Sequence, residues 1–131
     1  MKKIILSLVA LACALILPIS SADAAGNGSW DYVTTEPFEL KDGYLWVTKK
    51  VSSTGGDFMI KSNCNFYTEV QLWEYDPGSE NDDLVDTRSF GYGDEEIFRD
   101  INSFVDGSND KAEFFVVRYD DYNDGKVKFY D

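Results

Sequence analysis

Three short stretches of the chain concentrate carboxylates and side-chain amides. They are DPGSENDD (residues 76–83), DGSND (106–110) and DDYNDG (120–125). Calcium binds six to eight oxygen atoms from carboxylates, amides, backbone carbonyls and water, so these stretches hold the chemistry of a calcium site. None is an EF-hand, because the best register places Tyr122 where a ligand belongs. The alternative interpretation is that Asp, Asn and Gly simply favour turns.

Strand parity indicates which of these stretches can meet. Each antiparallel strand carries the chain to the opposite end of a sandwich, so alternate loops share an end. Loops 52–56, 76–83 and 106–110 then lie together, and loop 120–125 lies at the other end. Carboxylates held close together repel one another, and a cation would neutralise that repulsion. The predicted calcium ligands are Asp76, Asp82, Asp83, Asp106 and Asp110.

A second kind of site would use aromatic side chains. Alternation along residues 68–75 places Val70 and Leu72 on one face and Trp73 and Tyr75 among polar neighbours on the other. The same argument separates Trp46 from the apolar face of its segment. Trp46, Trp73 and Tyr75 are therefore candidates for a platform that stacks on sugar rings or meets a partner. Alternatively, these rings cover a loop or an edge, or the N-terminal segment buries them.

Several catalytic chemistries are excluded by composition. The chain contains no histidine, which removes Ser–His and Cys–His nucleophilic pairs and the usual zinc and copper sites. Paired carboxylates such as Glu95 and Glu96 remain for glycoside hydrolysis, but exposed acids lack the burial that tunes a proton donor. We therefore expect that the chain is not an enzyme.

Short segments with alternating polarity must position these residues. Segments 38–40, 44–51, 57–62, 66–75, 84–90, 112–119 and 126–130 read as strands separated by turns rich in Gly, Asn and Asp. Many short strands of this kind predict a single antiparallel β-sandwich or barrel. Residues 94–107 also fit a helical stripe, but a strand, a short helical turn and a loop are favoured.

Two stretches resemble known families. DINSFVDGSNDKAEFFV (100–116) resembles a phrase of jelly-roll carbohydrate-binding and galactose-binding-like domains, which implies a sandwich fold. LWEYDPGSENDDLVDTRSF (72–90) resembles the calcium-loop hairpin of C2 domains. The second resemblance implies that Asp76, Asp82 and Asp83 ligate calcium.

The N-terminal residues predict export. Lys2 and Lys3 precede an apolar run over residues 4–17, and Ala22-Asp23-Ala24 fits a signal-peptidase site. We expect a signal peptide over residues 1–24 and a secreted domain over 25–131, with no membrane-spanning segment. Processing removes Cys13 and leaves Cys64, which is then either buried or available for an interchain link.

The charge of the processed chain limits its partners. The whole sequence has 12 basic and 24 acidic residues; removal of two lysines and one aspartate leaves 10 and 23, a net charge of −13. Such a chain repels nucleic acid and favours cations or basic partners. The predicted function is a secreted, non-catalytic and monomeric binding module that calcium can support. The alternatives are a protein-directed effector (an inhibitor, immunity factor or small toxin) that uses its acidic surface on a basic partner, and a small glycoside-active enzyme.

Overall fold

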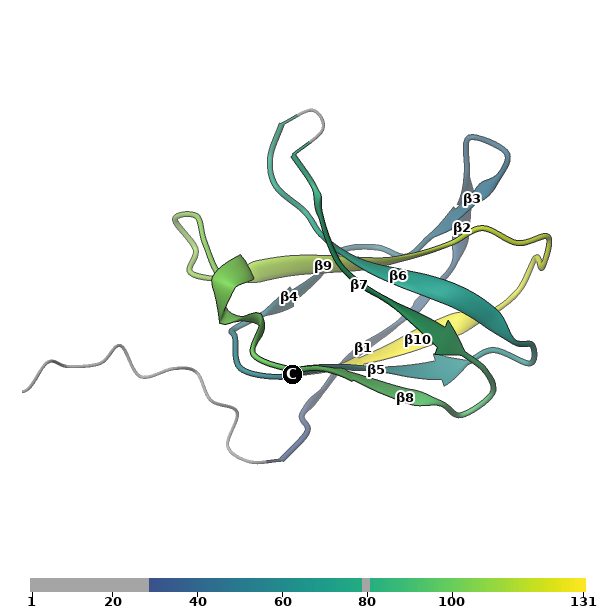
Figure 1. Ribbon diagram of the computed structural model, residues 1–131, viewed down its shortest axis with the longest axis horizontal. Coiled ribbons are helices and arrows are strands. Elements are labelled where there is room, and N and C mark those ends of the chain that lie inside the picture. Colours follow the sequence, from purple (N-terminus) through teal and green to yellow (C-terminus); the bar gives the residue numbers. More distant parts are fainter. Residues whose placement is uncertain (1–28, 79–80) are drawn as a thin grey trace, which may run out of the picture.

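The computed structural model describes residues 29–78 and 81–131 as two antiparallel β-sheets packed face to face (Figure 1). The predicted antiparallel β-sandwich is confirmed. The elements run in the order β1 (Tyr32–Pro37), β2 (Glu39–Lys41), β3 (Leu45–Val47), β4 (Val51–Ser53), β5 (Phe58–Asn63), β6 (Thr68–Glu74), β7 (Asp83–Phe90), β8 (Glu95–Phe98), the 3-10 turn η1 (Ile101–Phe104), β9 (Ala112–Arg118) and β10 (Lys126–Tyr130).

Strand order places β9 at the centre of the larger sheet. The four-stranded sheet has the order β1-β10-β5-β8, and the other sheet has the order β2-β3-β9-β6-β7. The short strand β4 pairs with the N-terminal half of β9, on the same side of β9 as β3, which pairs with its C-terminal end. One end of β9 therefore borders the loops around residues 76–83, and its other end leads into residues 119–125 (Figure 1).

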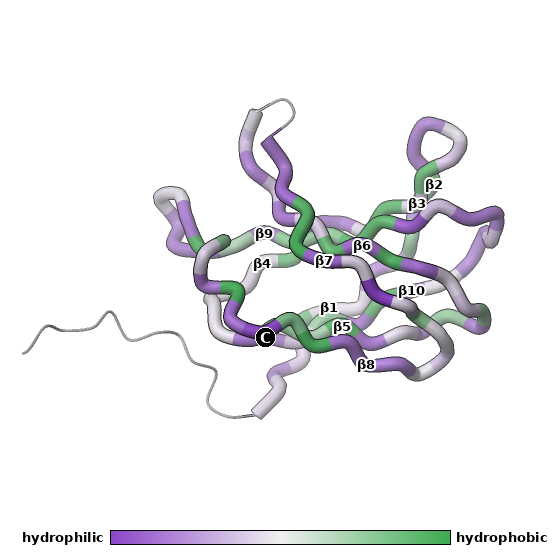
Figure 2. The backbone as a smooth tube through the Cα atoms, viewed as in Figure 1, coloured by the Kyte–Doolittle hydropathy of each residue, from purple (hydrophilic) through white to green (hydrophobic). Residues whose placement is uncertain are grey.

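The core follows the alternation of the strands. In β6, Val70 and Leu72 are fully buried, and Phe114 and Val116 of β9 are buried beside them. Phe114 packs on Phe58 of the opposite sheet with ring centroids 4.8 Å apart. Hydrophobic residues gather in the strands, whereas the loops are mostly hydrophilic (Figure 2). Burial of apolar area at about 25 cal/mol per Å² makes this shared interior the main source of stability.

The observed strands differ from the sequence-based expectation in two main respects. The predicted strand 44–51 is divided into β3 and β4. The division follows Val47, where Thr48 bonds to β9 through its side chain as well as its backbone, so the regular backbone pairing with β9 is interrupted. The Thr48 backbone N–H donates to the Val116 carbonyl at 3.0 Å, and its Oγ1 accepts from the Val116 N–H at 3.0 Å. Strand β1 is not among the predicted strands, and it is an edge strand that ends in Pro37, as edge strands tolerate.

Residues 94–107, which also fit a helical stripe, fold as the favoured interpretation predicts. Residues 95–104 form β8 followed by the short turn η1, rather than one helix. Asp100 takes the left-handed conformation (φ 51°) at the start of this turn. The Ile101 N–H donates to the Gly56 carbonyl at 2.7 Å, and Asn102 Oδ1 accepts from the Gly56 N–H at 2.8 Å. Loop 52–56 thus meets η1, and Ser53 pairs with Ala112, which follows loop 106–110, so both loops lie toward the same end of the sandwich.

The predicted signal peptide, residues 1–24, lies outside the described residues. Among residues 29–78 and 81–131, no helix has the length and apolar character required to cross a membrane.

Cys64 is buried in the core, where its Sγ donates to the Lys126 carbonyl at 3.7 Å. Burial raises the pKa of its thiol. Gly125 passes so close that a Cβ at this position would lie 2.7 Å from Cys64 Sγ. The thiol therefore has no room to meet a reagent without local opening of the fold.

We expect folded chain 25–131 to react with a thiol reagent at least about a hundredfold more slowly than the same chain in urea, since reaction requires an opening that costs a few kcal/mol. Absorbance of the released thiolate measures the rate. A matched control places the only cysteine on the exposed 106–110 turn, as Ser108→Cys with Cys64→Ala, and this variant should react quickly without denaturant. Fast reaction of native Cys64, or a disulfide-linked dimer, contradicts the prediction.

Candidate functional site

The clearest cluster of ionisable groups lies where β6 ends and β7 begins. Glu74 is the last residue of β6, Asp83 is the first of β7, and the two are paired across the sheet. Asp76 follows two residues after Glu74. One carboxylate oxygen from each of these three residues lies within 4.8 Å of the others. We name Glu74, Asp76 and Asp83 the acidic triad.

Glu74 points inward because it continues the buried face of β6. Val70, Leu72 and Glu74 alternate on that face, and only 1% of Glu74 is exposed. Among the residues that the structure describes, none forms a hydrogen bond with its Oε1. Burial raises the pKa of Glu74 to about 7, and the negative charges of its neighbours add to the effect; in decreasing order they are Asp76, Asp106, Asp83 and Glu113. A buried, unpaired carboxylate that faces two further carboxylates is costly unless a proton or a cation neutralises it.

The other predicted ligands divide into two that adjoin the acidic triad and one that lies outside it. Asp82 Oδ1 accepts from the Asp76 N–H at 3.1 Å, which shapes the loop. The pKa of Asp76 is raised by burial and then by the charges of Asp106 and Asp83, so Asp106 from the next loop also borders the acidic triad. Asp110 lies on an exposed turn with φ 51° and is not a member of the acidic triad. Residues 79 and 80 of the acidic loop lie outside the described residues.

The donor set of the acidic triad suits a hard divalent cation. Calcium takes oxygen ligands at 2.3–2.6 Å in flexible geometry, and carboxylates bind it through one or both oxygens. Three carboxylates within 4.8 Å provide three to six such oxygens. Asp106 borders them, since its charge contributes to the raised pKa of Asp76, but it is not one of the three. Zinc and copper prefer nitrogen and sulfur ligands, which this cluster does not contain.

Trp73 and Tyr75 lie on the outer face of the larger sheet. Trp73 pairs with Phe115 of β9, and its indole N–H donates to Gln71 Oε1 at 3.0 Å. Tyr75 carries the ammonium of Lys50 above its ring, 3.5 Å from the centroid. Both aromatic side chains are half-buried, so each is already engaged with a neighbour on its own face.

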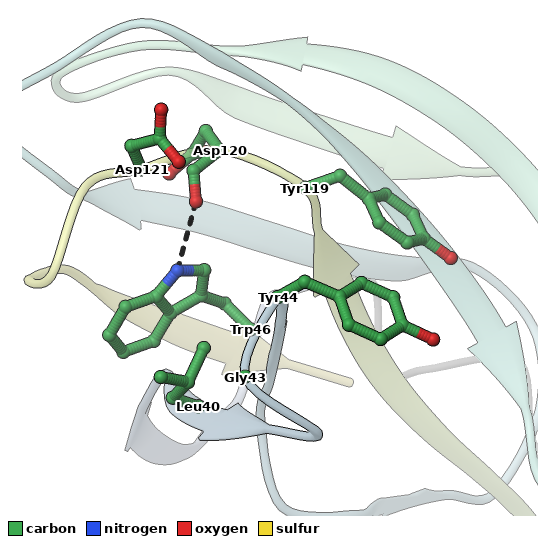
Figure 3. A pocket seen from close by; sticks show the side chains of 7 residues that line it. All are labelled: Leu40, Gly43, Tyr44, Trp46, Tyr119, Asp120 and Asp121. Carbon is green, nitrogen blue, oxygen red and sulfur yellow. Dashed lines mark hydrogen bonds between the residues drawn. The ribbon is translucent and has the colours of Figure 1, made fainter.

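Trp46 does not share that face. It pairs with Arg118, whose side chain is buried with Phe114 and Val116, whereas Trp73 pairs with the outward Phe115. The three predicted platform residues thus do not form one surface. Trp46 instead lines a pocket of about 460 Å³ at the opposite end of β9 from the acidic triad (Figure 3). The pocket is lined by Leu40, Gly43, Tyr44, Trp46, Tyr119, Asp120 and Asp121.

Behind this pocket lies Arg118, the largest fully buried side chain in the described residues. Its guanidinium carbon is 4.6 Å from the centroid of the Phe38 ring, 4.8 Å from that of Trp46 and 4.9 Å from that of Phe66. Flat guanidinium faces stack well on aromatic rings.

The edges of the same guanidinium hold the loop after β9. Nη1 forms an ion pair with Asp120, and Nη2 donates to the carbonyls of Tyr122 at 3.0 Å and Asp124 at 2.7 Å. Arg118 therefore fixes the wall of the pocket that Asp120 and Asp121 provide.

Comparison with known proteins finds a matching family model and a bacterial relative. A family model described as the YndA coiled coil domain matches residues 32–129. The chain is 38% identical to the uncharacterized protein YndA of Bacillus subtilis (strain 168), with 98% of this chain and 97% of the relative covered. No solved structure matches. Residues 29–78 and 81–131 contain strands and one 3-10 turn but no α-helix, so the coiled coil of the family's description does not correspond to this part of the chain. These two matches show that the chain belongs to the YndA family.

Proposed function

We propose that the chain is a secreted, non-catalytic binding module in which a calcium ion at the acidic triad joins the loops at one end of the sandwich. The observation that carries this proposal is Glu74, a buried carboxylate that faces Asp76 and Asp83 and whose Oε1 has no partner within residues 29–78 and 81–131. A structural acid of a stable core is normally paired or hydrogen-bonded. A cation in the acidic triad would satisfy Glu74 and offset the mutual repulsion of its neighbours.

The geometry also indicates what the ion would do. Glu74 and Asp83 belong to adjacent strands, Asp76 to the loop between them, and Asp106 to the loop that follows η1. An ion bound by the first three and approached by the fourth would hold Asp76, at the start of the acidic loop, and Asp106, in the loop after η1, in one arrangement. Fixed loops at one end of a rigid sandwich are a common way to present a binding surface.

We expect calcium to stabilise the processed chain more than magnesium does. Extracellular calcium modules bind with dissociation constants of about 0.1–1 mM, so 10 mM calcium should add about 1.4–2.7 kcal/mol to the free energy of unfolding. For a domain of this size the melting temperature should rise by roughly 6–20 °C. Scanning calorimetry in chelator, calcium or magnesium at matched ionic strength measures the shift.

Matched variants separate a specific site from screening of the acidic surface. Asp83→Asn removes a ligand that is exposed, so the variant should fold and lose the difference between calcium and magnesium. Asp124→Asn removes the same charge at the opposite end and should keep the difference. Equal stabilisation of the unmodified chain by both ions, or a calcium-specific shift that survives Asp83→Asn, would rule out the proposed site.

A further inference from the structure

The pocket beside Trp46 presents aromatic rings and carboxylates, and the described residues that line it include no basic side chain. Tyr44 is 65% exposed and Tyr119 is 59% exposed, so most of each ring is available to a ligand. Figure 3 shows that both tyrosine hydroxyls point in the same direction, whereas Trp46 and the two aspartates lie toward the other side of the pocket. Exposed aromatic side chains around a hollow differ from Trp73 and Tyr75, whose rings are each engaged with a neighbour.

The floor of the pocket is fixed before a ligand arrives. The Trp46 indole N–H donates to the Asp120 carbonyl at 3.0 Å, and its ring lies against the guanidinium of Arg118. Asp120 itself is occupied, since its carboxylate pairs with Arg118 and accepts from Thr68 Oγ1. In contrast, within the described part of the chain the Asp121 carboxylate takes part in no hydrogen bond or ion pair.

We propose that this pocket binds an organic cation, an alkylammonium or guanidinium group, with Asp121 as its counter-ion on one side of the pocket and the rings of Tyr44 and Tyr119 in contact with the rest of the ligand on the other side. The faces of aromatic rings carry partial negative charge and attract cations. The lining adds a free carboxylate and no basic group, and the whole chain carries a net charge of −12. A basic side chain of a polypeptide and a free polyamine share this chemistry.

The inference names the ligand class of the proposed binding module, and it does not depend on calcium. The pocket and the acidic triad lie at opposite ends of the seven-residue strand β9, roughly 20 Å apart along the strand. Binding to the pocket is therefore measured in chelator. If calcium does not bind the acidic triad, the result for the pocket can still be interpreted, and if the pocket binds no cation, the calcium result is unaffected.

The test is a titration of isotope-labelled processed chain followed by NMR. The probes are N-acetyl-arginine amide, which represents a peptide-borne cation, and putrescine, which represents a free diamine. We expect at least one of them to give saturable shifts of the Trp46 indole and Asp121 amide signals, with a dissociation constant on the order of a millimolar. The tighter probe identifies the source of the cation. N-acetyl-citrulline amide, a neutral isostere, and methyl glucoside should leave these signals in place.

Variants test the assigned roles. Tyr44→Ala, Tyr119→Ala and Asp121→Asn change exposed side chains and should each weaken binding by about two- to fivefold. Tyr92→Ala removes an equally exposed ring that does not line the pocket and should leave the affinity unchanged. Raising the salt concentration should weaken binding. The proposal is overturned if the neutral isostere or the glucoside binds as tightly as the cations. It is also overturned if no probe gives a saturable shift.

Discussion

Replacement of Arg118 by methionine is expected to lower the free energy of unfolding by about 3–5 kcal/mol, a large share of the total stability of an ordinary domain. The guanidinium is completely buried, pairs with Asp120 and donates to the carbonyls of Tyr122 and Asp124. Methionine preserves much of the apolar contact with the surrounding rings. It leaves the Asp120 carboxylate without its ion-pair partner, although the Thr68 hydroxyl and the Tyr122 N–H still donate to it, and it leaves both carbonyls without the guanidinium donor. Buried acceptors that lose their donor are costly.

Urea unfolding followed by tryptophan fluorescence measures the loss. Arg99→Met is the matched control, because Arg99 pairs with Asp57 at the surface with its side chain 70% exposed, and exposed pairs contribute at most about 1 kcal/mol. Arg118→Lys should fall between the two, since an ammonium retains the charge but not the planar fork that reaches three acceptors. A loss for Arg118→Met no larger than that for Arg99→Met would show that the buried contacts do not stabilise the loop.

The fold is largely predictable from sequence because alternation and turns are local signals. Residues 57–62, 84–90 and 126–130 are short segments between turns rich in Gly, Asn and Asp, and each corresponds to an observed strand. The division at Thr48 is not predictable, since it depends on hydrogen bonds to Val116, 68 residues away. Strand β1 escapes prediction because an edge strand has little apolar patterning of its own and is defined by its partner β10.

Glu74 and Arg118 are important residues that do not stand out in the sequence. Signals for both are nevertheless present, since Glu74 continues the alternation of Val70 and Leu72, and Arg118 continues that of Val116. A charged residue in phase with buried neighbours is either neutralised by a partner or part of a site. For Arg118 the partner is Asp120, whereas Glu74 has none at Oε1 in the described chain.

Strand parity predicts which loops meet but not how their side chains point. The loops that carry Asp76 and Asp106 approach each other, as expected from their shared end. Asp110 belongs to the same loop as Asp106 but lies in a left-handed turn, and Asp82 turns its carboxylate to the backbone of Asp76. Local backbone conformation sets these directions. Strand parity alone therefore predicts which loops lie together but not which of their carboxylates face one another. The roles of these residues toward calcium stay predictions.

The second large effect concerns pH. In chelator, the free energy of unfolding should fall as pH rises from about 4.5 to 7, because Glu74 has a pKa of about 7 in the folded chain against an ordinary value of 4.5. Between these values the folded chain binds more protons than the unfolded chain, so each rise in pH favours unfolding. The shift corresponds to a loss of roughly 3 kcal/mol that is complete above pH 7. Asp76, whose pKa is also raised, adds to the same trend at lower pH.

Glu74→Gln links this pH dependence to the proposed ion. The amide cannot ionise, so the variant in chelator should be more stable than the unmodified chain at pH 8 by roughly 3 kcal/mol and should lose most of the slope between pH 4.5 and 7. It should also lose the calcium-specific gain, because an ion in the proposed site would displace the proton of Glu74 and bind the ionised carboxylate. Glu69→Gln, an exposed change on the same strand, should preserve both the slope and the calcium response.

Chemical denaturation across this pH range, with and without calcium, measures both effects of Glu74→Gln. If Glu74→Gln leaves the slope intact, the buried carboxylate is not the group that titrates; if it flattens the slope but retains the calcium response, Glu74 is a structural acid and not a ligand.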